Sequence, residues 1–364
     1  MWKLNLKRST VIHYGLLALV LVIVWLTQAI PAWGEGYART VYPYISPILM
    51  TLSGWIPFSL GDLFITLSIF WVLLYPIYGI IKKTGWKKIL KRIVTYLAWV
   101  YVWFYLAWGL NYSQHNFYQR TKTPYVAYTP ENFKGFLDDY IEKLNAAYVS
   151  VSELEELDRF VVHAEVINQY KQLSTGLGVH PPKGNPRVKT MMFTPLFSKM
   201  AITGYMGPFF CEFNLNGDLL PSQYADTYAH EMAHLLGITS EAEANFYAYQ
   251  VCIHSEDARI RYCGYFSVFS HVLNNARRLM VENEEEYKAL LDSIRPEIIQ
   301  QAIADREYWM AKYSPTISNI QSRIYDWYLK GNKIQSGRKN YSEVVGLLIS
   351  WYNSSQTTHL YSTK

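Results

Sequence analysis

The segment His230–His234 carries the residue types that a zinc centre needs. It reads His-Glu-Met-Ala-His, so its two histidines are four residues apart. On a helix this spacing places both imidazoles on one face, and neutral imidazole suits Zn²⁺ at roughly 2.0–2.1 Å. Glu231 is turned by about 100° around the helix, so it reaches a zinc-bound water rather than the ion. There it can act as general base, while zinc lowers the pKa of that water towards about 7.

A catalytic zinc keeps three protein ligands, so a third ligand must be found. Glu241 and Glu243 are the candidates. They lie roughly opposite each other around a predicted helix, so only one of them can face the ion. Ser240 and Glu243 have the spacing of a capping box, in which the glutamate bonds to backbone N–H groups. A capping box would occupy Glu243 with backbone donors, but the spacing by itself leaves both glutamates open as the third ligand.

The HExxH segment and the residues after it resemble a known peptidase pattern. A helical E-x-x-A-N-x-x-A follows at 241–248, and the combination resembles the gluzincins: thermolysin-like peptidases and the membrane-embedded CAAX-prenyl protease type. The resemblance implies that Glu241 is the third ligand and that Asn245 supports His230 from the second shell. It also implies small residues at Ala244 and Ala248. The sequence departs from the pattern in having Asn at 245, where Asp is commoner, and in the short step from the second histidine.

The whole chain also resembles an uncharacterised family of bacterial membrane proteins. Members of that family have three N-terminal spans followed by an extracytoplasmic HExxH domain. The resemblance implies the same division here.

A helix pair linked by salt bridges is the alternative interpretation of these residues. Ionisable groups in an apolar setting are costly unless they are paired or bound to metal. The two predicted helices are otherwise apolar, which favours the metal site; their apolar residues include Met232, Leu235, Leu236, Phe246 and Val251. Donors that could stabilise a transition-state oxyanion are present but unranked: Tyr205, Tyr228, Tyr247, His254 and Arg259.

Around this segment the sequence predicts a mainly α, α+β globular domain over residues 111–364. Three- and four-residue apolar spacing predicts helices, and short apolar runs between Gly and Pro predict strands. The helices nearest the site are expected at 131–151, 164–175, 224–236 and 240–254, and the strands at 187–194 and 208–215. The resemblance implies a zincin-like fold with a small sheet before the active-site helix. The run 207–215 is either an edge strand that pairs with a peptide or a core strand.

Residues 1–110 predict a multi-pass α-helical membrane anchor. Hydrophobic residues make up 50% of the chain, and they are densest here. Three segments have the roughly 20 apolar residues that cross a bilayer, at about 11–30, 63–81 and 93–110. The first is either a retained span or a cleaved signal peptide. Residues 34–57 are too interrupted for a span and suggest a short surface helix or a re-entrant piece.

Loop charges predict the orientation of the anchor. The segment 82–92 carries six cations, and Lys3, Lys7 and Arg8 precede the first span. By the positive-inside rule both regions lie in the cytoplasm, so the third helix runs outward. We therefore expect a protein of the cytoplasmic (plasma) membrane, with its N-terminus inside and its C-terminal domain extracytoplasmic.

Charge and cysteine usage exclude other classes. The net charge of +5 is too small to indicate nucleic-acid binding, and no basic stripe interleaved with aromatics appears. No CxxC pair is present, so a thiolate zinc site is not expected. In one interpretation Cys252 and Cys263 form a disulfide. In the other, all three cysteines, Cys211 included, are free and buried.

These observations predict a zinc-dependent peptidase, integral to the lipid bilayer, that hydrolyses peptide or protein substrates. The alternatives are a non-catalytic zinc-binding sensor or interaction protein, and a zinc amidohydrolase acting on cell-envelope amides. A transporter has little support, because the spans hold few polar groups. The sequence does not determine the oligomeric state.

The orientation yields a direct test. A reporter that is active only in the cytoplasm is expected to be silent when fused after Lys364, because the positive-inside rule places that end outside. The same reporter fused after Lys83, in the cationic loop, is expected to be active. Measuring reporter activity in both fusions checks the topology, and activity of the Lys364 fusion would overturn it.

Overall fold

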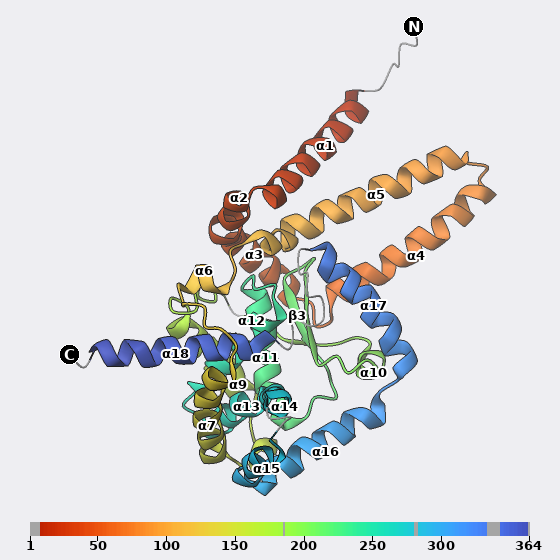
Figure 1. Ribbon diagram of the computed structural model, residues 1–364. Helices are drawn as coiled ribbons and strands as arrows, with labels where there is room; N and C mark the ends of the chain where they lie inside the picture. Colours follow the sequence, from red (N-terminus) through yellow and green to blue (C-terminus); the bar gives the residue numbers. More distant parts are fainter. Residues whose placement is uncertain (1–7, 185, 280–282, 333–342, 363–364) are drawn as a thin grey trace. The chain divides into compact units, whose positions relative to one another are not determined.

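The computed structural model describes residues 8–184, 186–279, 283–332 and 343–362 (Figure 1). The chain is mostly helical, with one small mixed sheet, and it folds into two compact units. Unit 1 contains the described residues up to 115, together with 184–187 and 207–212, and unit 2 contains the others.

The elements of unit 1 are α1 (Arg8–Ala29), α2 (Pro31–Gly36), a π-helical turn (Tyr37–Val41), α3 (Tyr42–Gly54), α4 (Leu60–Ile81), α5 (Trp86–Ala107) and a 3-10 turn (Gly109–Ser113). Helices α1, α4 and α5 are long and apolar enough to cross a membrane, which confirms the expectation of three such helices. Helix α5 begins seven residues before the predicted span, because the lysines and arginine ahead of the apolar run are themselves good helix formers. The segment 34–57, which was expected to hold a short surface helix or a re-entrant piece, is mostly helical.

A glutamate from a distant part of the chain caps α4 within unit 1. The Glu212 carboxylate accepts hydrogen bonds from the Gly61 N–H at 2.6 Å and the Ser59 hydroxyl at 3.1 Å. The Phe209 ring lies 4.9 Å from that of Phe64, on the first turn of α4. Negative charge is favourable at a helix N-terminus, where N–H groups lack partners. Residues 207–212 are thereby built into the unit that holds the apolar helices.

The elements of unit 2 before the histidine helix are α6 (Phe117–Thr121), α7 (Pro130–Ala147), α8 (Val151–Glu155), α9 (Arg159–Leu173), β1 (Lys189–Thr190) and α10 (Thr194–Ser198). Strands β2 (Gly204–Gly207) and β3 (Glu212–Leu215) follow, each with one end in unit 1. The later helices are α11 (Pro221–Leu235), α12 (Glu241–Ile253), α13 (Ala258–Ser267), α14 (Phe269–Leu279), α15 (Glu284–Ser293), α16 (Pro296–Lys312), α17 (Pro315–Gly331) and α18 (Val344–Ser362).

The sheet precedes the histidine helix, but its strands differ from those predicted. The order is β1-β3-β2, and β1 pairs parallel to β3 with Lys189 opposite Asn214. Within the predicted strand 187–194 only the two residues of β1 form a strand. Within the predicted strand 208–215 only β3 does. The reason is local: Pro208 lacks the N–H that a ladder requires, and Cys211 has φ +47° in a turn. Strand β3 is central and buried, so β1 and β2 are the two edge strands of the described sheet.

Three aromatic contacts hold α11 in place. The Tyr170 hydroxyl of α9 donates to the Ala229 carbonyl at 2.7 Å, and the Tyr228 hydroxyl lies 2.6 Å from His163 Nδ1. The Phe213 ring of β3 meets the Tyr228 ring edge-on, with centroids 5.1 Å apart. Buried aromatic side chains pack with defined geometry, so these contacts orient the histidine helix. The three cysteines are free and buried.

Candidate metal centre

Helix α11 presents both histidines on one face, as their spacing predicts. His234 Nδ1 lies 2.7 Å from the Ile238 carbonyl oxygen. A carbonyl oxygen only accepts, so Nδ1 carries the hydrogen and the Nε2 lone pair of the neutral ring is left for another partner. This contact sets the tautomer in which Nε2 can bind a metal.

A short turn returns the chain over these histidines. Gly237 has φ +96°, a conformation that favours glycine. The Ser240 hydroxyl then accepts from the Glu243 N–H and begins α12 at Glu241. The turn is tight enough to place the first residue of α12 beside the last turn of α11.

Three ligand atoms meet at this point. The Nε2 atoms of His230 and His234 are 3.1 Å apart, and Glu241 Oε2 lies 3.2 Å and 3.3 Å from them. In a tetrahedral zinc site with bonds of about 2.0–2.1 Å, neighbouring ligand atoms are about 3.3–3.4 Å apart. The two imidazoles and one carboxylate therefore fit a zinc ion in both chemistry and spacing.

Burial and mutual charge shift the pKa values of the three groups. Burial disfavours the charged form of His234, but the Glu241 carboxylate outweighs it and raises the His234 pKa to about 9. The His230 pKa is also raised, because its hydrogen bond to Glu241 outweighs burial. Burial would raise the Glu241 pKa, but His234 and His230 hold it well below its usual range. In the absence of an ion, these shifts favour a shared proton within the cluster.

Glu231 lies beside the cluster and is buried. Its Oε2 atom has no hydrogen-bond partner among the residues that the structure describes. Burial raises its pKa to about 7. A side chain at Gly204 of β2 would come within 2.5 Å of Glu231 Oε1, so strand β2 passes directly against this carboxylate. A buried acceptor atom without a partner is costly, and its presence here favours a missing ligand or water at this position.

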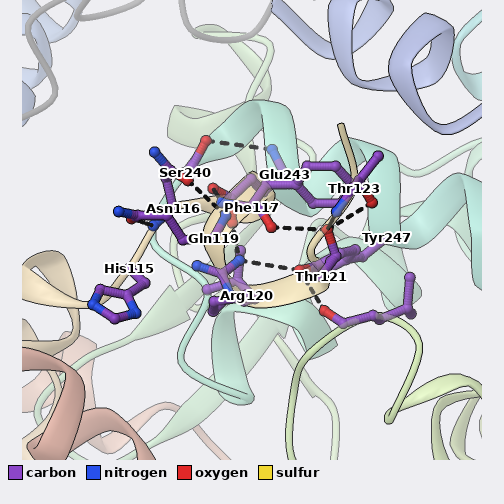
Figure 2. Close-up of polar contacts among 12 residues, drawn as sticks. His115, Asn116, Phe117, Gln119, Arg120, Thr121, Thr123, Ser240, Glu243 and Tyr247 are labelled. Atoms are coloured by element: carbon purple, nitrogen blue, oxygen red, sulfur yellow. Dashed lines mark hydrogen bonds and ion pairs between the residues drawn. The ribbon is translucent and has the colours of Figure 1, made fainter. Parts of the chain in front are cut away.

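The Glu243 side chain lies against residues of α6 (Figure 2). Its carboxylate accepts from the Phe117 N–H at 3.0 Å and forms an ion pair with Arg120. Arg120 also donates to the Tyr247 hydroxyl at 3.0 Å. Burial disfavours the charge of Arg120, but Glu243 raises its pKa above the ordinary value. The geometry thus brings Glu241 to the histidines and gives Glu243 a separate partner.

Asn245 is half-buried one turn after Glu241, and its support of His230 stays a prediction. Four of the five oxyanion candidates have other hydrogen-bond partners: Tyr228 has His163, Tyr247 has the Leu177 carbonyl, Arg259 has Asp257, and His254 has the Gln250 carbonyl. Tyr205 lies on β2.

Two residues beside the cluster were not predicted. The Tyr325 hydroxyl of α17 donates to Glu241 Oε1 at 2.5 Å. Asp226 lies one turn before His230 on α11, and its buried Oδ1 has no partner in the described part of the chain. The Asp226–His230 spacing was visible in the sequence. The Tyr325 contact was not, because 84 residues separate it from Glu241.

Comparison with known proteins places the chain in a family. Residues 37–349 match a family described as Protein of unknown function (DUF3810). The chain belongs to the DUF3810 family. The match includes α4, α5 and every residue of the cluster, whereas no curated protein and no solved structure matches. The family description names no chemistry, so the function of this DUF3810 protein is argued from the site.

Metal content is the first test of the cluster. We expect about one zinc ion per chain in the purified wild type, and its loss in His230→Ala and Glu241→Gln, because each change removes one of three ligands. Elemental analysis after gentle purification measures it. Wild-type protein without metal would show that the three side chains form a hydrogen-bonded cluster only.

Glu243→Gln is the matched control, because it makes the same change two residues away. It leaves the buried Arg120 charge without its anionic partner, which costs up to about 3–5 kcal/mol. Thermal unfolding should therefore show a less stable protein that still holds its zinc. Loss of zinc from the folded Glu243→Gln protein would make Glu243 the ligand.

Zinc affinity should depend on pH. Below about pH 9 the metal-free protein holds a proton on His234, and the ion must displace it. Affinity should therefore fall as pH falls, by about tenfold per pH unit for each proton released. Competition with a chromophoric chelator between about pH 6 and pH 8 measures this slope. A flat profile would contradict proton release from the cluster.

Proposed function

We propose that this DUF3810 protein is a zinc-dependent peptidase anchored in the cytoplasmic membrane, with unit 2 outside the cytoplasm. The observation that carries the proposal is the meeting of His230, His234 and Glu241 beside a buried carboxylate, Glu231, that has an atom without a partner. The resemblance of the HExxH and E-x-x-A-N segments to gluzincins supports the same function.

The residues of the site have distinct roles in this proposal. His230, His234 and Glu241 would hold the ion, which supplies Lewis acidity for attack on a carbonyl. Glu231 accepts the proton of the attacking water and passes it to the leaving amine, as a general base and then a general acid. Tyr325 orients Glu241 through its hydrogen bond.

A peptide is favoured over other amides by the edge strand. Strand β2 lies at one end of the order β1-β3-β2 among the described strands, and Gly204 brings its backbone against Glu231. An extended peptide can add to such an edge through main-chain hydrogen bonds. Its scissile bond would then lie along the strand that passes the general base.

Replacing Glu231 tests the role of the general base. Glu231→Gln keeps the size of the side chain but cannot accept the proton, so turnover should fall by about 10²–10⁴-fold. The measurement is cleavage of a fluorogenic peptide library by the reconstituted full-length protein, together with zinc content.

Zinc should be retained in Glu231→Gln, because Glu231 is not a ligand in the proposal. Loss of zinc from the Glu231→Gln protein would contradict the assignment of Glu231 as general base and indicate that it is a ligand. Zinc binding by the wild type without cleavage of any peptide would favour the non-catalytic sensor.

A further inference from the structure

Helix α17 follows α16 in unit 2 (Figure 1), and one face of it contacts the candidate metal centre through Tyr325. Ser318 and Leu329 are buried on this face. Tyr325, on the same side of the helix, donates to Glu241 Oε1 at 2.5 Å. A partner on the outer face of α17 is therefore separated from the candidate ligand Glu241 only by the width of this helix.

The outer face of α17 carries an apolar stripe. Ile320, Ile324 and Trp327 are 60%, 63% and 79% exposed. Steps of four and three residues place them in one row along the helix. Asn319, on the polar flank of the stripe, is also exposed. Helix α17 thus has an exposed apolar side although its buried side includes a serine and a tyrosine hydroxyl.

This pattern is typical of a helix that lies in a membrane interface. Such helices bury an apolar face at the boundary of headgroups and acyl chains, with Trp anchors and flanking cations. Trp327 is on the stripe, and Arg323 and Lys330 are exposed beside it. Arg323 suits the phosphates of anionic lipids, whereas Lys330 forms an ion pair with Asp326 of the same helix at 2.7 Å.

A short stretch of chain tethers unit 2 to a membrane-length helix. Helix α5 is long and apolar enough to span the membrane, and residues 108–116 connect it to α6 of unit 2. Nine residues extend at most about 30 Å. A stable protein partner usually covers about 800 Å² on each side, more than three side chains present, whereas a bilayer accepts a narrow stripe.

We propose that the outer face of α17 docks on the lipid surface of the membrane in which the protein is anchored. The contact is made by the Ile320–Ile324–Trp327 stripe, while the opposite face keeps Tyr325 on Glu241. The candidate metal centre is thereby held close to the bilayer. The proposal concerns lipid contact alone, so it does not depend on the peptidase assignment.

Site-specific fluorescence tests the docking in the full-length protein. Ile324→Cys and Ile320→Cys report on the stripe, and Asn319→Cys is the matched control on the polar flank of the same helix. Each variant is labelled with an environment-sensitive fluorophore and reconstituted into phosphatidylethanolamine–phosphatidylglycerol vesicles that contain headgroup-proximal nitroxide lipids. Wild type supplies the background, because its three thiols are buried.

Nitroxide lipids should quench the labels at 320 and 324 several-fold more than the label at 319. Equal, weak quenching at all three positions would overturn the proposal. So would labels at 320 and 324 that report an apolar environment without lipid quenching, because a second copy of the chain or the protein's own apolar helices would then cover the stripe. Thermal unfolding of each labelled variant verifies that the fold is kept.

Discussion

The turn between α11 and α12 is the constraint on which the candidate metal centre depends. Five residues must reverse the chain and deliver Glu241 to the Nε2 atoms of both histidines. Gly237 supplies the conformation with φ +96°, and the Ile238 carbonyl fixes the ring of His234 within the same turn. Ala233 and Ala244 are fully buried, and such small side chains let the two helices approach closely. The turn between α11 and α12 thus sets both the spacing of the ligand atoms and the tautomer of His234.

Distant contacts then hold α12 in its orientation. Arg120 and the Phe117 N–H bind Glu243, so the first turn of α12 is fixed from the side opposite the cluster. Tyr325 holds Glu241 from α17. A carboxylate that accepts several hydrogen bonds is restrained in position, which is the condition for a preorganised ligand. The two acidic residues of α12 consequently have different partners although they are two positions apart.

The anchor and the site are linked through the chain itself. Strand β2 begins at Gly204, beside Glu231, and residues 207–212 belong to the unit of apolar helices. Glu212 caps α4 with a carboxylate that is buried and hydrogen-bonded. The strand that passes the proposed general base is therefore continuous with a segment built into the membrane unit.

The sequence alone determined the features that arise from local periodicity. Histidines four residues apart share a helix face, and long apolar runs form membrane-length helices, whatever the rest of the chain does. The spacing left Glu241 and Glu243 open as the third ligand, and only the tertiary structure placed Glu243 on Arg120 and Tyr325 on Glu241. Those contacts join residues separated by up to 123 positions, and no local pattern encodes which distant element packs there. For the same reason β2 was missed: Gly204–Gly207 has weak strand propensity, and pairing with β3 makes it a strand.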